Sequence, residues 1–340
     1  MLTYATFVTG LQEPISNWLV EEGYRIRQML DGAILYEAQK NKKILPCFFN
    51  TFSVLDLEKK SGPKAVEQLM RKVLQRQLSN ASNIKRGRGS FRIVTSRENQ
   101  LIAVDKKLRS DVERLIAFKT GLVPDRRGGG REFWFLARSE GIVLFMERQP
   151  SHKEHPLKKG ELRPQLAYCL NRLAAPTPED IMLDPFCGYG AITRTRANYF
   201  PCKAIYGIDI DRQKIKALQQ RASTTKGSIN YSHGDIRRLS STFPTKNPAS
   251  IDVIVTDPPW GLYGDNKEDD ISSLYKSMAA EFSQIIKPGG RIVILTAQKE
   301  LLRTHINKGL WGNTGNLKAF YDILVSGQKA AIFVIKASAN

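Results

Sequence analysis

The sequence of 340 residues predicts an α/β fold for its C-terminal half, with a doubly wound, mostly parallel sheet that ends in an antiparallel hairpin, and an α+β fold for its N-terminal half. From residue 181 onward, short apolar runs alternate with longer amphipathic stretches, which is typical of parallel strands joined by helices. The first 150 residues hold short alternating runs without that rhythm. Residues 149–160 contain two prolines and almost no apolar residue. We therefore expect domains at residues 1–150 and 161–340, joined by a linker at residues 151–160.

The C-terminal elements follow from the places where the apolar runs stop. Runs that end at a Gly, Asp or Pro turn signal predict buried strands at residues 181–184, 204–209, 251–257 and 291–296. A shorter strand is expected at residues 229–232. Helical spacing predicts helices at residues 211–224, capped by Asp211, and 271–286, closed by Lys287-Pro288-Gly289-Gly290. The runs at residues 320–325 and 330–336 flank Ser326-Gly327-Gln328 and predict the terminal hairpin.

The N-terminal half combines short strands with two longer helical patterns. The alternating runs predict strands at residues 2–8, 33–37, 91–95, 132–137 and 142–147. Apolar residues at helical spacing predict helices from residue 63 to about residue 78 and from residue 107 to 119, the second ending at Gly121. This mixture predicts an α+β domain.

The chain is strongly basic, with a formal net charge of +19 and a pI near 9.8, and both halves carry more Lys and Arg than Asp and Glu. Such an excess indicates a polyanionic partner such as a nucleic acid, although a merely solvated basic surface is the alternative. The four cysteines fall at no zinc-site or disulfide spacing, which predicts no metal and a reducing compartment. No leader and no long apolar run is present, so we expect a cytoplasmic protein without a membrane segment.

The segment Asp184-Pro185-Phe186-Cys187-Gly188-Tyr189-Gly190 follows a predicted strand and opens a helix. Glycines at positions 188 and 190 let the backbone turn sharply and approach a ligand closely, and a helix N-terminus offers free N–H groups. Because the motif is a single Gly-x-Gly, an amino-acid-bearing cofactor fits it better than a dinucleotide. A tight turn without a ligand is the alternative.

Two further acidic residues stand at the ends of the following strands. Asp209 lies about twenty residues after the glycine turn, where an acidic side chain accepts both hydroxyls of a ribose. Asp235, in His233-Gly234-Asp235-Ile236, follows the next short strand and could accept from an adenine amino group. A solvated aspartate at a strand end is the alternative for Asp235.

The segment Asp257-Pro258-Pro259-Trp260 follows a buried strand, at the sheet edge where open α/β folds bind ligands. An exocyclic base nitrogen is a poor nucleophile because its lone pair is delocalised into the ring. Hydrogen bonds from its two N–H groups to the Asp257 carboxylate and the Pro258 carbonyl would favour the nucleophilic form. The two prolines stiffen the backbone, and Trp260 offers a face on which an unstacked base can lie. A Pro-Pro turn with a core tryptophan is the structural alternative.

These motifs, in this order and followed by Lys287-Pro288-Gly289-Gly290-Arg291, resemble the class I methyltransferases that modify amino groups of nucleic acids, and most closely the THUMP-associated guanine-N2 RNA methyltransferase group. Residues 162–167, Leu-Arg-Pro-Gln-Leu-Ala, look like a helix of that group. The resemblance implies a Rossmann-like domain that binds S-adenosylmethionine through Asp184, Phe186, Gly188, Gly190, Asp209 and Asp235. It implies that Asp257 and Trp260 hold the target base. Tyr189 and Trp260 depart from the group, which usually has Ser and Tyr or Phe at these positions.

The first half is similar to a THUMP module with a preceding ferredoxin-like part, through Phe7–Glu13, Gly89–Ile93 and the helix that ends at Gly121. This similarity implies an RNA-binding region that reads RNA shape more than sequence. Its basic residues are expected to contact phosphates of structured RNA, most of all tRNA, with rRNA as the second choice: Lys85, Arg86, Arg88, Arg92, Arg126, Arg127 and Arg131. Solvated charge is the alternative for each of them taken singly.

Three other functions remain open at this point. Asp-Pro-Pro-Trp suits any exocyclic amine, so methylation of adenine N6 in RNA or DNA is the alternative within the same chemistry. A catalytically silent methyltransferase fold that only binds RNA is another, although retention of Asp209, Asp235 and Asp257 argues against it. A small-molecule or protein methyltransferase is disfavoured by the charge of +19.

Overall fold

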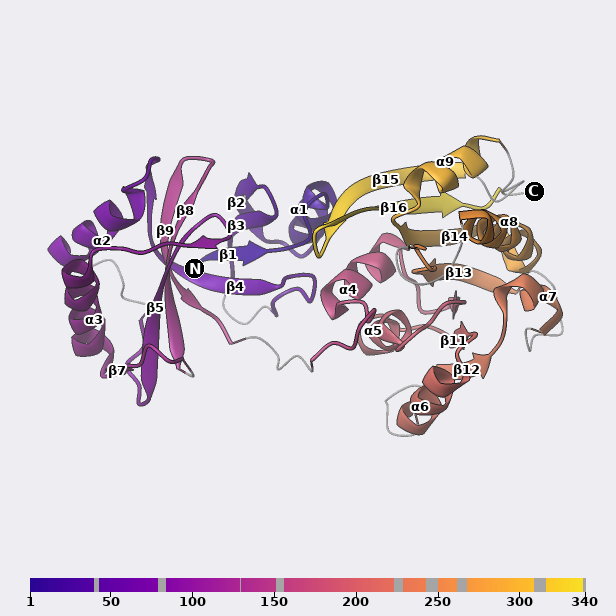
Figure 1. Cartoon of the computed structure of the whole chain (residues 1–340), viewed down its shortest axis with the longest axis horizontal. Helices are drawn as coiled ribbons and strands as arrows, with labels where there is room; N and C mark the ends of the chain where they lie inside the picture. The colour runs from indigo at the N-terminus through magenta and orange to yellow at the C-terminus, as the bar shows by residue number, and fades with distance from the viewer. Residues whose placement is uncertain are drawn as a thin grey trace. The chain divides into compact units, whose positions relative to one another are not determined.

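The chain divides into two compact units, each of which we describe by itself (Figure 1). The computed structural model describes residues 1–39, 43–78, 84–128, 130–150, 156–222, 229–242, 250–261, 268–308 and 316–338. The first unit comprises Met1–Phe7, Ile15–Ile44 and Phe48–Lys153, and the second comprises Val8–Pro14, Leu45–Cys47 and Glu154–Asn340. Residues 151–155 of the predicted linker lie outside the described residues, whereas residues 156–160 belong to the second unit.

The first unit is built on one nine-stranded sheet with the order β2-β3-β1-β4-β9-β8-β5-β6, and β7 pairs with β5. Its pairs are antiparallel except β5 with β8 and with β7. The strands are β1 Leu2–Thr6, β2 Arg25–Leu30, β3 Ala33–Glu37, β4 Asn50–Lys59, β5 Ser90–Arg97, β6 Gln100–Leu101, β7 Val123–Pro124, β8 Arg131–Arg138 and β9 Ile142–Arg148. The helices are α1 Gln12–Glu21, whose residues up to Pro14 are grouped with the second unit, α2 Ala65–Gln75 and α3 Lys106–Thr120.

The apolar face of α2 and one side of α3 pack on β5, β8 and β9, and their buried residues form one core. The predicted end of α3 is confirmed: Gly121 has a φ of +75° and its N–H donates to the carbonyl of Ala117. The α+β prediction is therefore correct. Strand β4, which pairs with β1 on one side and β9 on the other, was not predicted. Its polar residues Asn50, Thr51, Ser53 and Asp56 hide the strand pattern, although much of the strand is buried.

The second unit contains a seven-stranded sheet with the order β12-β11-β10-β13-β14-β16-β15. The first five strands are mutually parallel, and β16 runs antiparallel to both β14 and β15. The strands are β10 Ile181–Asp184, β11 Ala204–Asp209, β12 Ile229–His233, β13 Ile251–Thr256, β14 Ile286–Thr296, β15 Asn316–Val325 and β16 Gln328–Lys336. The predicted doubly wound sheet with a terminal hairpin is confirmed.

Within the described residues, the helical segments of the second unit are α4 Pro164–Leu173, α5 Ala191–Tyr199, α6 Arg212–Ala222, the 3₁₀ turn η1 Ile236–Arg238, α7 Leu239–Thr242, α8 Glu268–Ile285 and α9 Lys299–Asn307. Apolar residues of α8 pack on β13, β14 and β16 in the main core of this unit. Strand β11 pairs with one edge of β10, and β13, which comes later in the chain, pairs with its other edge. The strand order reverses at β10, which is where open α/β sheets leave a crevice for ligands.

Two details differ from or extend the predicted elements. Strand β14 starts at Ile286 and not at Arg291, because Ile286 already pairs with Ile251 and residues 287–290 bulge out before Arg291 pairs with Val253. In the hairpin, Val325 pairs with Gln328 across a two-residue turn in which Ser326 and Gly327 have φ of +49° and +85°. Positive φ at both positions is the geometry of the tight turns that suit twisted strands.

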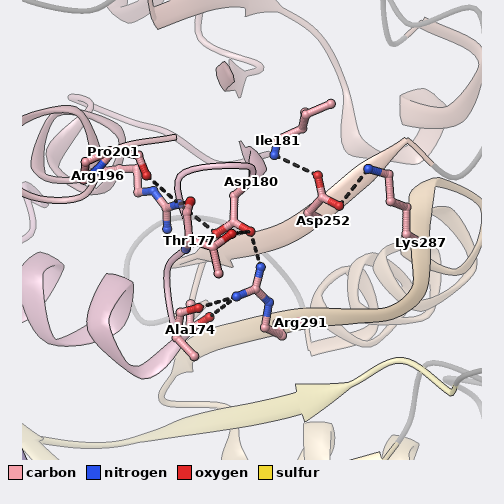
Figure 2. A network of polar contacts seen from close by, with 10 residues as sticks. Ala174, Thr177, Asp180, Ile181, Arg196, Pro201, Asp252, Lys287 and Arg291 are labelled. Atoms are coloured by element: carbon pink, nitrogen blue, oxygen red, sulfur yellow. Dashed lines mark hydrogen bonds and ion pairs between the residues drawn. The ribbon is translucent and has the colours of Figure 1, made fainter. Parts of the chain in front are cut away.

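A network of ion pairs fixes the amino-terminal edge of this sheet (Figure 2). Asp180, just before β10, accepts from Arg196 at 2.7 Å and from Arg291, and both Asp180 and Arg196 are buried. Beside this pair, Asp252 accepts from the N–H of Ile181 at 2.9 Å and from Lys287 at 2.7 Å. Helix α5 and strands β10, β13 and β14 are thereby tied together at the edge opposite Asp184.

No helix within the described ranges is long and apolar enough to cross a membrane.

Candidate active site

A cavity of about 560 Å³ opens at the carboxyl ends of β10, β11 and β13 in the second unit. The acidic residues expected at the strand ends all line it: Asp184, Asp209, Asp235 and Asp257. Phe186, Gly188 and Pro259, also predicted from the motifs, belong to its wall. The parallel strands thus bring four separate sequence motifs to one ligand-sized space, as the order of the motifs predicts.

The turn from Cys187 to Gly190 forms the floor between β10 and α5. Gly188 and Gly190 have φ of +52° and +77°, and the N–H of Gly190 donates to the carbonyl of Cys187 at 2.6 Å. A Cβ on Gly190 would lie 2.8 Å from the side chains of Leu218 and Tyr231, so a larger residue does not fit there. Gly190 therefore packs closely against Leu218 and Tyr231, whereas Gly188 lines the cavity itself.

Asp209 links the glycine turn to the start of α6. Its carboxylate accepts hydrogen bonds from the N–H groups of Gly188 and Asp211, each at 2.8 Å, and the residue is only 8% exposed. Each oxygen keeps a second acceptor site, as two ribose hydroxyls require. Asp211 accepts from the N–H groups of Gln213 and Lys214, which confirms its predicted role as a helix cap.

Asp235 caps η1 at the end of β12. One of its carboxylate oxygens accepts from the N–H of Arg237 at 3.0 Å, and the other lies 3.4 Å from the Arg237 guanidinium. Both residues line the cavity. The carboxylate of Asp235 is thus held in place and retains the capacity to accept a further hydrogen bond.

Asp184, at the end of β10, lines the cavity and is only 1% exposed. It accepts from the Thr256 hydroxyl at 2.9 Å and from the N–H of Phe186 at 3.3 Å. Burial raises the pKa of Asp184 to about 8 despite these hydrogen bonds, and the nearby carboxyls of Asp257 and Asp209 add to the increase. Such a concentration of acidic groups attracts a cation.

Asp257 is the first residue of the loop after β13, and the side chain of Trp260 contacts the Asp257 carboxylate. The indole N–H of Trp260 donates to Oδ1 of Asp257 at 2.8 Å, while the Trp260 carbonyl accepts from the side-chain amide of Gln298 at 2.6 Å. Burial raises the pKa of Asp257 to about 7, and the hydrogen bond from Trp260 opposes the increase. Pro258 is buried and Pro259 is exposed at the cavity wall. Trp260 is half-buried and is not among the described residues that line the cavity.

Sequence reasoning missed several residues of the site. Gly160, Glu161 and Leu162 form part of the cavity wall just before α4, although the first of them was assigned to the linker. From α8, Asp270, Ile271 and Leu274 also line it. No local motif marks Gly160, Glu161 or the residues of α8, and Leu162, the first residue of the Leu-Arg-Pro-Gln-Leu-Ala segment, was not assigned to the site. Only the folded chain brings these residues to the strand ends. Gln298, in the turn between β14 and α9, was equally unmarked.

Two lysine ammonium groups lie close to the ring of Tyr189 at the wall of the cavity. The ammonium groups of Lys158 and Lys214 are 4.7 and 5.4 Å from its ring centre. Tyr189 and Lys214 both line the cavity. The tyrosine therefore joins the start of α6 to the segment that precedes Glu161, a role that a serine at this position could not fill.

The predicted RNA-contacting residues all belong to the first unit and differ in how far their charge is compensated. Arg92 pairs with Glu132, Arg126 pairs with Glu113 at 2.9 Å, and Arg131 pairs with Glu147 at 2.6 Å. Arg127 lies 4.0 Å from the Asp125 carboxylate but its side chain is almost fully exposed, and Lys85, Arg86 and Arg88 are exposed as well. The segments that carry them run side by side, since the N–H of Gly87 donates to Thr120 and that of Val123 donates to Gly89.

Comparisons with known proteins agree with this architecture. The chain is 28% identical over 229 residues to a tRNA (guanine(6)-N2)-methyltransferase of Thermus thermophilus, which covers 66% of this chain and 67% of the relative. It is 31% identical over 215 residues to the mouse tRNA (guanine(6)-N(2))-methyltransferase THUMP3. That match covers 58% of this chain and 41% of the mouse protein, so the chain spans about two-fifths of this relative's length.

Solved structures share the fold over the whole chain. TrmN from Thermus thermophilus superposes with a TM-score of 0.78 at 21% identity, covering 99% of both chains. SMU.472, solved in complex with SAH, superposes with a TM-score of 0.69 at 14% identity, covering 100% of this chain and 98% of the other. The family model for an RMKL-like methyltransferase domain matches residues 152–324, which is about half of the chain and includes every acidic residue of the cavity. The chain therefore belongs to the RMKL-like methyltransferase domain family.

Proposed function

We propose that this protein transfers the methyl group of S-adenosylmethionine to an exocyclic amino nitrogen of a base in structured RNA, namely N2 of a guanine in tRNA. The observation that carries the proposal is the convergence of the glycine turn, Asp209 and Asp257 on one cavity. The relatives named above methylate guanine N2 in tRNA, as their names state. Soluble, cytoplasmic action is part of the same proposal, supported by four cysteines that are not paired.

Asp209 would accept the ribose hydroxyls of the cofactor, Asp235 its adenine amino group, and the glycine turn with Asp184 its methionine end. The cofactor carries a positive sulfonium, and three carboxyls line the cavity close to one another: Asp184, Asp209 and Asp257. The cofactor supplies an activated methyl group. The residues of this chain therefore need only bind and orient the two reactants and receive a proton.

Asp257 would accept one N–H of the target amine, and the Pro258 carbonyl would accept the other. Both bonds strengthen as the nitrogen becomes tetrahedral and positively charged, so they favour the transition state over the ground state. A carboxylate with a pKa near 7 is also able to receive the proton that the methylated nitrogen releases. We further propose that the first unit is a THUMP-like module that docks the RNA through its exposed basic residues Lys85, Arg86, Arg88 and Arg127.

Transfer of labelled methyl from S-adenosylmethionine to total tRNA and rRNA tests this function, with the product digested to nucleosides. We expect the label in N2-methylguanosine of the tRNA fraction, and its loss in Asp257→Ala. Label in N6-methyladenosine would keep the mechanism and overturn the base. Cofactor binding without any labelled RNA would overturn the proposed substrate class.

A further inference from the structure

Two hydrogen bonds that both involve Trp260 hold the start of the loop after β13. Its carbonyl accepts from Nε2 of Gln298 at 2.6 Å, which fixes the main chain of the loop. Its indole N–H donates to Oδ1 of Asp257 at 2.8 Å, which fixes the side chain that precedes the prolines. A tryptophan that served only as a flat surface for a base would not need the bond from its indole N–H.

The Gln298 end of this arrangement is anchored in the core of the second unit. The N–H of Gln298 donates to the hydroxyl of Thr296 at 2.8 Å, and that hydroxyl lies 2.6 Å from the hydroxyl of Tyr275. Thr296 and Tyr275 are both fully buried. Hydrogen bonds therefore link Tyr275 of α8 to Thr296 and Thr296 to Gln298. Further bonds link Gln298 to Trp260 and Trp260 to Asp257.

The loop has little room to move away from these contacts. Gly261 has a φ of +70°, and a Cβ on it would lie 2.9 Å from the side chain of Ile271 in α8. The two prolines restrict the backbone between Asp257 and Trp260. The position of Asp257 is thus determined by the end of β13 and by the contacts of Trp260 and Gly261.

We propose that Gln298 is a positioning residue and that Trp260 acts through its indole N–H. The two together hold Asp257 so that Oδ1 is occupied, whereas Oδ2, to which no residue of the described ranges donates, is left for the substrate amine. This inference rests on the function proposed above. It assigns to Trp260 a role that a phenylalanine, with the same flat face and no N–H, could not perform.

The indole N–H also stabilises the ionised form of Asp257. Among the described residues, the titratable groups whose pKa this carboxyl raises are Asp184 at the end of β10 and Tyr275 in α8, and neither of them supplies a positive charge. Removal of the N–H therefore raises the pKa of Asp257 above its value of about 7. The ionised fraction at neutral pH falls as a consequence.

The first test is the pH profile of kcat for Trp260→Phe, which keeps an aromatic face. We expect the rising limb of the profile to move to higher pH, with a kcat at pH 6 that is about two- to tenfold lower than that of the native protein and a smaller deficit at pH 9. A profile that keeps its midpoint while KM for RNA rises would show that Trp260 acts only as a stacking surface, and would overturn the inference.

The second test is Gln298→Glu, which keeps the size of the side chain and removes the donor to the Trp260 carbonyl. We expect kcat at saturating cofactor and RNA to fall about two- to tenfold, with the affinity for cofactor unchanged. Gln219→Glu is the matched control, because Gln219 also donates its amide to a backbone carbonyl, that of Tyr231 at 2.8 Å. Equal kcat for the two variants would contradict the positioning role of Gln298.

A third measurement needs neither RNA nor activity. The chain has four tryptophans, and the indole N–H resonance absent from Trp260→Phe identifies Trp260 in a nitrogen–proton NMR spectrum. We expect this resonance to shift with pH with a midpoint near 7, and the shift to disappear in Asp257→Asn. A resonance that does not respond to pH would overturn the inference while the proposed function stands. Native protein that binds cofactor and methylates no RNA would overturn the function and this inference together.

Discussion

Asp184 is a carboxyl group that the fold keeps away from water and next to other acidic groups. It is 1% exposed, and burial together with Asp257 and Asp209 raises its pKa to about 8. Near neutral pH the group is therefore mostly protonated in the protein without ligand. A cation in the cavity would favour the ionised form, so binding of the proposed cofactor is coupled to release of a proton.

This coupling predicts that the affinity for S-adenosylmethionine increases as the pH rises from about 6 to about 8, by up to about tenfold per pH unit where one full proton is released. Titration calorimetry in two buffers of different ionisation enthalpy measures both the affinity and the proton. The comparison variant is Asp184→Asn, which mimics the protonated form and should lose the pH dependence. A pH-independent affinity in the native protein would contradict the prediction.

The same raised pKa has the opposite consequence for stability without ligand. Because the folded state holds the Asp184 proton more tightly than the unfolded chain does, its contribution to stability is present below the unfolded pKa of about 4 and is lost as pH rises through about 8. Affinity for the cofactor and stability of the empty site thus change in opposite directions with pH.

At the scale of an element, the turn from Lys158 to Glu161 is part of the wall of the cavity. The turn closes on itself, since the N–H of Glu161 donates to the Lys158 carbonyl at 3.0 Å. Glu161 pairs with Arg194 of α5 at 3.0 Å, and Nε of Arg194 donates to the carbonyl of Gly190 at 3.1 Å. One side chain thereby connects the wall to the glycine turn.

We expect Glu161→Ala to weaken binding of S-adenosylmethionine about two- to tenfold, because it breaks this partly buried pair, and to leave kcat at saturating cofactor unchanged. Equilibrium binding of the cofactor and of its demethylated product measures the effect. The double change Glu161→Arg with Arg194→Glu should restore part of the affinity. Lys287→Ala, which breaks an ion pair at the opposite edge of the sheet, is the control and should bind as the native protein does. An unchanged affinity in Glu161→Ala would contradict the assigned role.

At the scale of the whole molecule, the second unit is not a continuous piece of chain. Val8–Pro14 and Leu45–Cys47 belong to it, although both come from the N-terminal half of the sequence. The backbone of Gly10 lies so close to Asp322 of the terminal hairpin that a Cβ on Gly10 would lie 1.9 Å from the Asp322 carbonyl oxygen. Cys47 is completely buried.

A fragment of residues 151–340 should therefore unfold at a lower temperature than the corresponding transition of the full chain, because it loses two packed segments. Thermal unfolding followed by circular dichroism, in the presence and absence of S-adenosylmethionine, measures the difference. A fragment with the same midpoint as the full chain would show that these segments contribute nothing to the second unit. Addition of the missing segments as a peptide tests the reverse effect.

The sequence determined the parallel sheet and most of its strand bounds, because buried parallel strands are continuous apolar runs and each ends at a turn residue. Ile181–Asp184 and Ala204–Asp209 were predicted to the residue. It also determined which acidic residues stand at the strand ends, since motifs are local in the chain. The convergence of Asp184, Asp209, Asp235 and Asp257 then follows from the rule that parallel strands end at the same edge.

Only the tertiary structure decided what surrounds those residues. The sequence marks Asp257 and Trp260 but not the hydrogen bond between them, and it marks neither the support from Gln298, nor the wall at Glu161, nor the inclusion of Val8–Pro14 in the second unit. Strand β4 was not predicted for a similar reason. Its polar residues obscure the strand pattern, and only the pairing with β1 on one side and β9 on the other identifies it as a strand. Hydrogen bonds and packing between distant segments depend on three-dimensional proximity, and periodicity along the chain reports only on a residue's own element.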